Sequence, residues 1–233
     1  MASEFPNSPK LLKGALVVYA SHDPGATSKI IPFQYNPEQV SRSLAHVGSQ
    51  SGGTTGTTPG ASRGQAQQDV LRVQGPPRES FTLSVTLDAA DQLELPEQNR
   101  NVVDNGLHSV LASLEMLLYP TSFQVLQNES LAQRGEVQLN PADLPLTLLV
   151  WGRSRVVPVK LTSFSVTEDA FDPRLNPIQA KVELGLQVLS YVDLPADSAG
   201  RDIYLSYQRQ KETLAGKYSA GQDAEPIQGL LPD

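Results

Sequence analysis

Residues 146–194 read LTLLVWGRSRVVPVKLTSFSVTEDAFDPRLNPIQAKVELGLQVLSYVDL and indicate three successive strands without a reactive side chain. In the last of them, apolar and polar residues alternate, the period of two that is typical of a half-buried antiparallel strand. The apolar set is Ile178, Ala180, Val182, Leu184, Leu186 and Val188, and the polar set is Gln179, Lys181, Glu183 and Gln187. This run is much longer than the usual ~5 to 6 residues. We therefore expect it to extend beyond its own sheet, where a neighbouring subunit can pair with the excess.

The preceding strand changes phase within residues 155–168. Val157, Val159 and Leu161 share one face, whereas Phe164 and Val166 belong to the other. One extra residue near Thr162–Ser163, a β-bulge, would place both sets on the same side. Alternatively, the two halves of the strand are covered on different faces, as when a strand leaves a barrel and enters an intersubunit sheet. The sequence leaves both interpretations open.

Further strands and two helices are predicted outside this segment. The strands are expected at residues 13–20, 31–35, 40–47 and 79–88. A core-facing helix is predicted from Val103, Leu107, Val110, Leu111, Leu114, Leu117 and Leu118, and it should end at Tyr119–Pro120 because proline cannot continue the hydrogen-bond ladder. A mostly polar helix is predicted within residues 201–218, with a weak apolar stripe of Ile203, Tyr204, Tyr207 and Leu214. The expected fold class is therefore mainly β with added α-helix.

Residues 48–68 read GSQSGGTTGTTPGASRGQAQQ and contain no large apolar side chain that could attach them to a core. This composition predicts a mobile loop. The expected organisation is a β domain over residues 1–199 that includes this loop, followed by a helix and flexible tail over residues 200–233.

Composition excludes several classes of function. The 233-residue chain has no cysteine, which removes disulfides, thiol chemistry and cysteine metal sites. Its formal net charge of −7 disfavours nucleic-acid binding, which needs clustered Lys and Arg. No apolar run approaches the ~18 residues of a membrane span, and the first residues lack the pattern of a signal peptide. We expect a cytoplasmic protein that does not insert into membranes.

The search for chemistry gives no converging set of reactive groups. The histidines, His22, His46 and His108, are far apart in the sequence and are interpreted as solvated side chains. Three carboxylates occur in one connection, at Asp88, Asp91 and Glu94, but their spacing does not match a calcium loop. We expect no catalytic site, no metal and no cofactor.

Two sets of residues remain as surface candidates. Trp151 at a strand end is interpreted as a core or rim residue rather than a ligand platform. Arg153, Arg155 and Lys160 form a basic cluster that suits a phosphate or an acidic partner, or ion pairs with Glu168, Asp169 or Asp172 of an adjacent copy.

Three segments together resemble the tube-type domain of phage-tail-like contractile injection systems. They are FQYNPEQVSRSL at residues 33–44, ESFTLSVTLDAADQLE with the following leucine-rich helix, and the segment from Val150 to Leu194. The most specific residues are Trp151–Gly152, Val157–Pro158–Val159, Glu168 with Ala170–Pro173, and Leu175–Asn176–Pro177. Longer members of the family continue into a LysM-type module, and no pattern after Asp193 resembles one.

The resemblance implies an antiparallel β-barrel or β-sandwich with one packed α-helix, here followed by a C-terminal helix. It also implies a non-enzymatic hexameric ring that joins the spike and hub of the baseplate to the inner tube, with sheath or wedge proteins as further partners. The nominated interface residues are Asn36, Pro37, Arg42, Trp151, Arg153, Arg155, Glu168, Phe171, Asp172, Asn176 and Pro177. Two alternatives remain: a terminal cap of the tube, and a β-barrel that binds a small ligand or glycan through Trp151.

Overall fold

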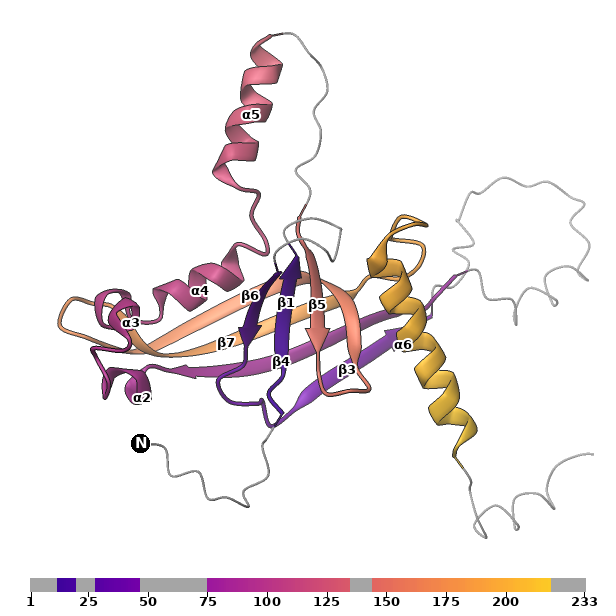
Figure 1. Ribbon diagram of the computed structural model, residues 1–233, viewed down its shortest axis with the longest axis horizontal. Coiled ribbons are helices and arrows are strands. Elements are labelled where there is room, and N and C mark those ends of the chain that lie inside the picture. The colour runs from indigo at the N-terminus through magenta and orange to yellow at the C-terminus, as the bar shows by residue number, and fades with distance from the viewer. Residues whose placement is uncertain (1–11, 20–27, 47–74, 135–143, 219–233) are drawn as a thin grey trace, which may run out of the picture.

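The computed structural model describes residues 12–19, 28–46, 75–134 and 144–218. Its seven strands form one antiparallel sheet in the order β2-β1-β5-β6-β7-β4-β3 (Figure 1). Their bounds are β1 Ala15–Tyr19, β2 Ser28–Pro32, β3 Val40–Ala45, β4 Arg78–Asp88, β5 Leu146–Val150, β6 Val156–Phe171 and β7 Pro177–Val188. The mainly β, antiparallel fold class predicted from the sequence is confirmed.

Helices lie at both ends of the long strands. At one end are α2 (Ala90–Leu93), α3 (Arg100–Asn105) and α4 (His108–Glu115), and at the other is α6 (Ala199–Gly216), while α5 (Ser122–Gln133) projects away from the body (Figure 1). One hydrophobic core joins the sheet to both ends, because leucines of α4 and two tyrosines of α6, Tyr204 and Tyr207, belong to the same buried cluster. None of the described helices is long and apolar enough to cross a membrane.

The phase change in β6 is a β-bulge. The register with β7 shifts between Leu161 and Ser163, so Thr162 is the extra residue. Beyond the bulge, Phe164 and Val166 pack against the core formed by the residues before it. The bulge interpretation is therefore confirmed, since the inserted residue returns the later apolar side chains to the core face.

The alternation in β7 is also confirmed, but its expected excess length is not available for a neighbour. Residues 180, 182, 184, 186 and 188 are buried, and residues 179, 181 and 183 are exposed. However, β7 pairs with β6 on one side and with β4 on the other from Gln179 to Gln187. A strand that is paired on both sides has no free edge along that length, and the only long open edge of this hairpin belongs to β6.

The single helix predicted up to Pro120 is interrupted at Gly106, which divides it into α3 and α4. Gly106 has a positive φ of 54°, and the N–H of Leu107 donates to the carbonyl of Pro177 at 2.9 Å instead of continuing the helical ladder. Helix α5 was not predicted at all. Its residues bury nothing, so the apolar periodicity that identified the other helices is missing there.

Three of the predictions concern residues that lie outside the described part of the chain. These are the mobile loop at 48–68, the flexible tail after residue 218, and the solvated state of His22.

Candidate functional site

The open edge of β6 is the longest unpaired strand edge in the described residues. On this side β6 pairs with β5 only through Val156–Val159, which face Thr147–Val150. Beyond Val159, no described strand pairs with this side of β6, although β7 follows its other side as far as Phe171. Residues 160–171 therefore present backbone N–H and C=O groups that another strand can use.

Side chains along this edge are mostly polar and exposed. Ser163, Ser165, Thr167, Glu168 and Asp169 are all exposed. Glu168, nominated from the sequence, has no ion-pair partner among the described residues of its own chain. The exposed part of this edge therefore carries mainly small polar and acidic side chains.

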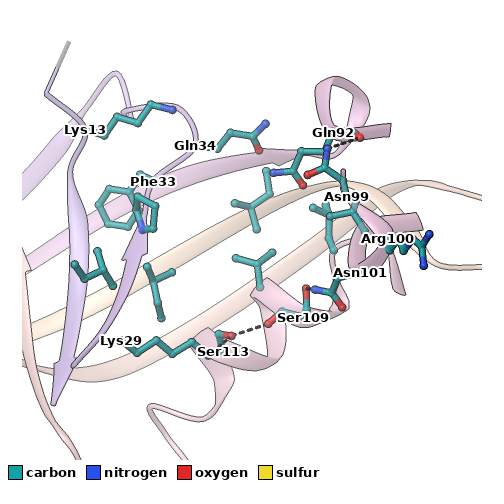
Figure 2. Close-up of a pocket in the computed structure, with 18 of the residues that line it drawn as sticks. Lys13, Lys29, Phe33, Gln34, Gln92, Asn99, Arg100, Asn101, Ser109 and Ser113 are labelled. Carbon is teal, nitrogen blue, oxygen red and sulfur yellow. Dashed lines mark hydrogen bonds between the residues drawn. The ribbon is translucent and has the colours of Figure 1, made fainter. Parts of the chain in front are cut away.

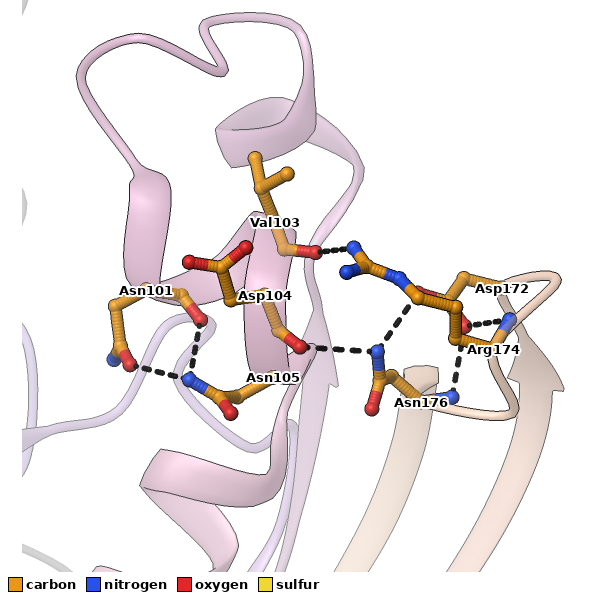
Figure 3. A network of polar contacts seen from close by, with 7 residues as sticks. All are labelled: Asn101, Val103, Asp104, Asn105, Asp172, Arg174 and Asn176. Atoms are coloured by element: carbon orange, nitrogen blue, oxygen red, sulfur yellow. Dashed lines mark hydrogen bonds and ion pairs between the residues drawn. The ribbon is translucent and has the colours of Figure 1, made fainter.

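The turn between β6 and β7 is held by one carboxylate. Asp172 Oδ1 accepts the backbone N–H groups of Arg174 at 2.7 Å and Asn176 at 2.8 Å, and its Oδ2 accepts the Asn176 side-chain amide at 2.9 Å (Figure 3). These hydrogen bonds, led by the backbone N–H of Asn176, hold the pKa of Asp172 below its usual value. Leu175 adopts a positive φ of 66° within the turn and is exposed.

The same turn is docked on α3. The Arg174 guanidinium donates to the carbonyl of Val103, and the Asn176 amide donates to the carbonyl of Asp104 at 3.2 Å (Figure 3). These acceptors are carbonyls at the C-terminal end of the helix, where cations and donors are favoured. Asp172, Asn176 and Pro177, which the sequence nominated as interface residues, therefore come together and fix the tip of the hairpin against the helix.

Gly106→Ala is expected to lower the free energy of unfolding by about 2 kcal/mol, because a side chain at positive φ is strained by ~1–3 kcal/mol. An added Cβ would also lie 2.4 Å from the carbonyl oxygen of Pro177. Gly216→Ala is the matched control, because an added Cβ there meets nothing within 4 Å. Urea denaturation of both variants measures the difference. Equal stability of the two proteins would show that the hairpin tip is not tightly docked.

Two other nominated positions pack the start of the sheet. Asn36 Oδ1 accepts the N–H of Gly14 at 2.8 Å, and Asn36 Nδ2 donates to the carbonyl of Leu12 at 2.9 Å. The Trp151 ring lies 6.3 Å from the ring of Phe33, and a Cβ on Gly14 would come within 2.5 Å of the indole. Asn36 and Trp151 are thus engaged within the chain, and the half-buried Pro37 follows Asn36 in a mostly exposed connection.

A buried carboxylate, Glu79, joins β4 to β3 and α6. Its side chain is 4% exposed. Glu79 Oε1 accepts from Arg42 Nε at 2.6 Å and from the Tyr207 hydroxyl at 2.7 Å, and Oε2 accepts from Lys211 Nζ at 2.7 Å. The Lys211 ammonium also lies 3.9 Å from the centre of the Tyr207 ring. This cluster fixes α6 to the sheet, and it explains the nominated Arg42.

The donors decide the charge state of the cluster. Burial alone raises the pKa of Glu79, but hydrogen bonds from Lys211, Tyr207 and Arg42 outweigh it and hold the pKa below 4.5. Burial, then the hydrogen bond to Glu79, raises the pKa of Tyr207 far above 10. Burial lowers the pKa of Lys211, and the hydrogen bond and charge of Glu79 offset this effect only in part. The Glu79–Lys211 pair therefore does not stabilise both charges equally. The carboxylate, with three donors, is the member most firmly held in its charged form.

The predicted basic cluster is not a single site. Arg155 lies over the Phe81 ring, 5.3 Å from its centre, whereas Arg153 and Lys160 are exposed. Among the acids, Asp88 accepts the N–H of Ala90 at 2.8 Å and the Gln179 amide at 2.8 Å. Across the described ranges, no group of three or more His, Asp or Glu side chains is placed to hold a metal ion.

Helix α5 adds an apolar surface that the single chain does not cover. Its Phe123 and Leu126 are 73% and 63% exposed, and none of its residues is buried. A capping box closes its start, since Gln124 N donates to the Thr121 hydroxyl at 3.3 Å and the Gln124 side chain accepts the N–H of Thr121 at 2.9 Å.

Sequence reasoning missed Glu79 and α5, although each left a signal. Glu79 is in phase with Phe81, Leu83 and Val85, so a charge on an apolar face of β4 pointed to a buried partner. The Thr121-x-x-Gln124 pattern marked the start of α5. No protein-family model matches the chain, and no curated protein matches its sequence.

Proposed function

We propose that this protein is a non-enzymatic structural subunit that assembles with copies of itself into a closed, six-fold ring in a phage-tail-like contractile particle. The observation that carries the proposal is the open edge of β6 at residues 160–171. An exposed edge is a template for another strand, and in a closed ring the β6 edge of every subunit can pair with a neighbour. In the particle, the ring would join the spike and hub of the baseplate to the inner tube.

Helix α5 supports the same proposal. A 12-residue helix without buried residues is marginal in water by itself. Its Phe123 and Leu126 would be covered by a neighbouring subunit, which adds apolar area to the backbone hydrogen bonds of the β6 edge. Tube, hub, and sheath or wedge proteins would then bind the two faces and the rim of the ring, in the cytoplasm where the particle assembles.

The test is hydrogen exchange followed by mass spectrometry on the assembled protein and on dilute monomer. We expect peptides that cover residues 163–170 to exchange at least tenfold more slowly in the assembly, because their free backbone groups become paired. Peptides from β7 should show no such change, because β7 is paired on both sides in a single chain. Light scattering should give a mass six times the 25.2 kDa of one chain.

A second test of assembly is the double variant Phe123→Ser, Leu126→Ser, which changes two exposed residues and leaves the core unchanged. We expect these substitutions to shift the protein toward monomer without changing its unfolding midpoint. A protein that stays monomeric at millimolar concentration, or a ring in which residues 163–170 exchange as in the monomer, would refute edge pairing as the basis of assembly.

A further inference from the structure

A second open strand edge borders a cavity of about 750 Å³ between β2 and helices α2 to α4. Residues 29–34 line one side of it consecutively, and α3 and α4 supply the opposite side (Figure 2). Its lining includes four buried apolar side chains, Ile31, Phe33, Leu87 and Leu107. The cavity is therefore elongated along a strand, with polar and apolar parts.

The polar lining of this cavity is cationic, in contrast to the acidic chain. Lys13, Lys29 and Arg100 line it, and none of its lining residues is Asp or Glu. Lys29 Nζ reaches across from β2 and donates to Ser113 Oγ of α4 at 2.7 Å, while Arg100 points away from the middle (Figure 2). Neutral amides fill the space between them, including Gln34, Gln92 and Asn99. For a chain with a net charge of −7, this lining favours an anionic ligand.

The backbone of β2 adds directional hydrogen bonds. The N–H of Phe33 donates to Gly14 on the β1 side at 2.8 Å. Because successive residues of an antiparallel strand point to opposite sides, the N–H and C=O of Ile30 and the C=O of Pro32 face the free side. Within the described residues, β2 pairs with β1 alone. The free side can therefore accept an extended segment by strand addition.

We propose that this cavity binds an extended acidic peptide segment of a partner protein, which pairs with Ile30 and places its carboxylates at Lys13 and Lys29. This site lies at the opposite end of the strand order from β3, it does not use the β6 edge, and it can bind in the monomer. A protein that does not bind such a peptide could therefore still form the proposed ring.

The test is fluorescence anisotropy with the full chain and a fluorescein-labelled peptide of four Glu-Val repeats. We expect binding that weakens with salt, and a loss of affinity of at least tenfold in the Lys13→Glu, Lys29→Glu double variant. A Gln-Val peptide should bind at least tenfold more weakly than the Glu-Val peptide. Lys181→Glu is the matched control, because Lys181 is exposed on the outer face of β7, and it should leave the affinity unchanged.

A peptide that is N-methylated at alternate positions distinguishes strand addition from charge attraction. It keeps the carboxylates but lacks the backbone N–H donors that strand addition requires. Equal binding of the methylated and unmodified peptides would overturn the proposal, as would equal binding by the double lysine variant and the parent protein. Removal of residues 1–11 is the last arm. A tenfold gain in affinity would identify residues 1–11 of the same chain as the occupant of the cavity. It would also overturn the proposal that a partner peptide binds there.

Discussion

Glu79→Ala is expected to lower the free energy of unfolding by about 3 kcal/mol, the lower part of the range for breaking a buried ion pair. The substitution removes the shared acceptor of Arg42, Tyr207 and Lys211, and it leaves two cations beside a buried hydroxyl. We use the lower part of this energy range because about a third of the Arg42 side chain and of the Lys211 side chain is exposed to solvent. Guanidinium denaturation measures the change, and Glu115→Ala on the exposed surface of α4 is the control.

Acid should reduce the difference between the parent protein and Glu79→Gln. Because the pKa of Glu79 is lowered on folding, its contribution is present above the unfolded value of 4.5 and is lost as the pH falls toward the lower folded value. Stability curves that stay equally far apart between pH 7 and pH 3 would contradict this assignment. So would a loss of less than ~1 kcal/mol in Glu79→Ala, which is the scale of an exposed ion pair.

Leu184→Asp is expected to prevent folding altogether, with a cost above about 4 kcal/mol. Leu184 is 1% exposed and lies between Leu83 of β4 and Phe164 of β6. A carboxylate there has no partner in an apolar environment, so it either stays charged at a large desolvation cost or takes up a proton. Circular dichroism and the soluble yield report the outcome.

Glu183→Lys is the matched control at the neighbouring position. Glu183 is exposed on the outer face, between Ser84 and Ser165. A change away from buried features usually stays within about 0.5 kcal/mol, so we expect a native spectrum and an unchanged unfolding midpoint. A folded Leu184→Asp protein, or equal losses in both variants, would show that the two faces of β7 have been assigned incorrectly.

Strands β4 and β7 could be predicted because each has one face in the core, whereas β3 buries none of its residues. In β4 from Phe81 and in β7 from Ala180, every second residue is apolar, and the structure buries those residues. The bulge in β6 was also readable, because Phe164 and Val166 are out of phase with Val159 by one residue. Strand order was less accessible from the sequence alone. The residues of β6 do not indicate which of its two sides stays paired beyond Val159, because the pairing depends on strands that are distant in the chain.

The interrupted helix and the buried carboxylate could not be predicted for the same physical reason. Gly106 breaks the helix because Pro177 of a distant strand takes the N–H of Leu107. Glu79 is tolerated in the core because Tyr207 and Lys211 arrive from a helix at the other end of the chain. Of the nominated residues, Asp172, Asn176 and Pro177 do meet at one place. Asn36 and Trp151 meet beside Gly14 at the start of the sheet, whereas Arg42 binds Glu79 elsewhere.

The strand order also determines how much of the chain must be synthesised before the sheet can be completed. Ala15 of β1 pairs with Val150 of β5, and Phe81 of β4 pairs with Leu186 of β7. At a typical ~5 to 20 residues per second, the ribosome exposes β1 and β4 several seconds before their second partners, β5 and β7, exist, although β2 and β3 can already pair with them. Contacts between such distant residues also slow folding itself, because the connecting chain must first be closed. The nascent chain therefore carries two apolar strands that each have one unpaired edge through most of its translation, which makes protection of those edges during synthesis a requirement of this topology.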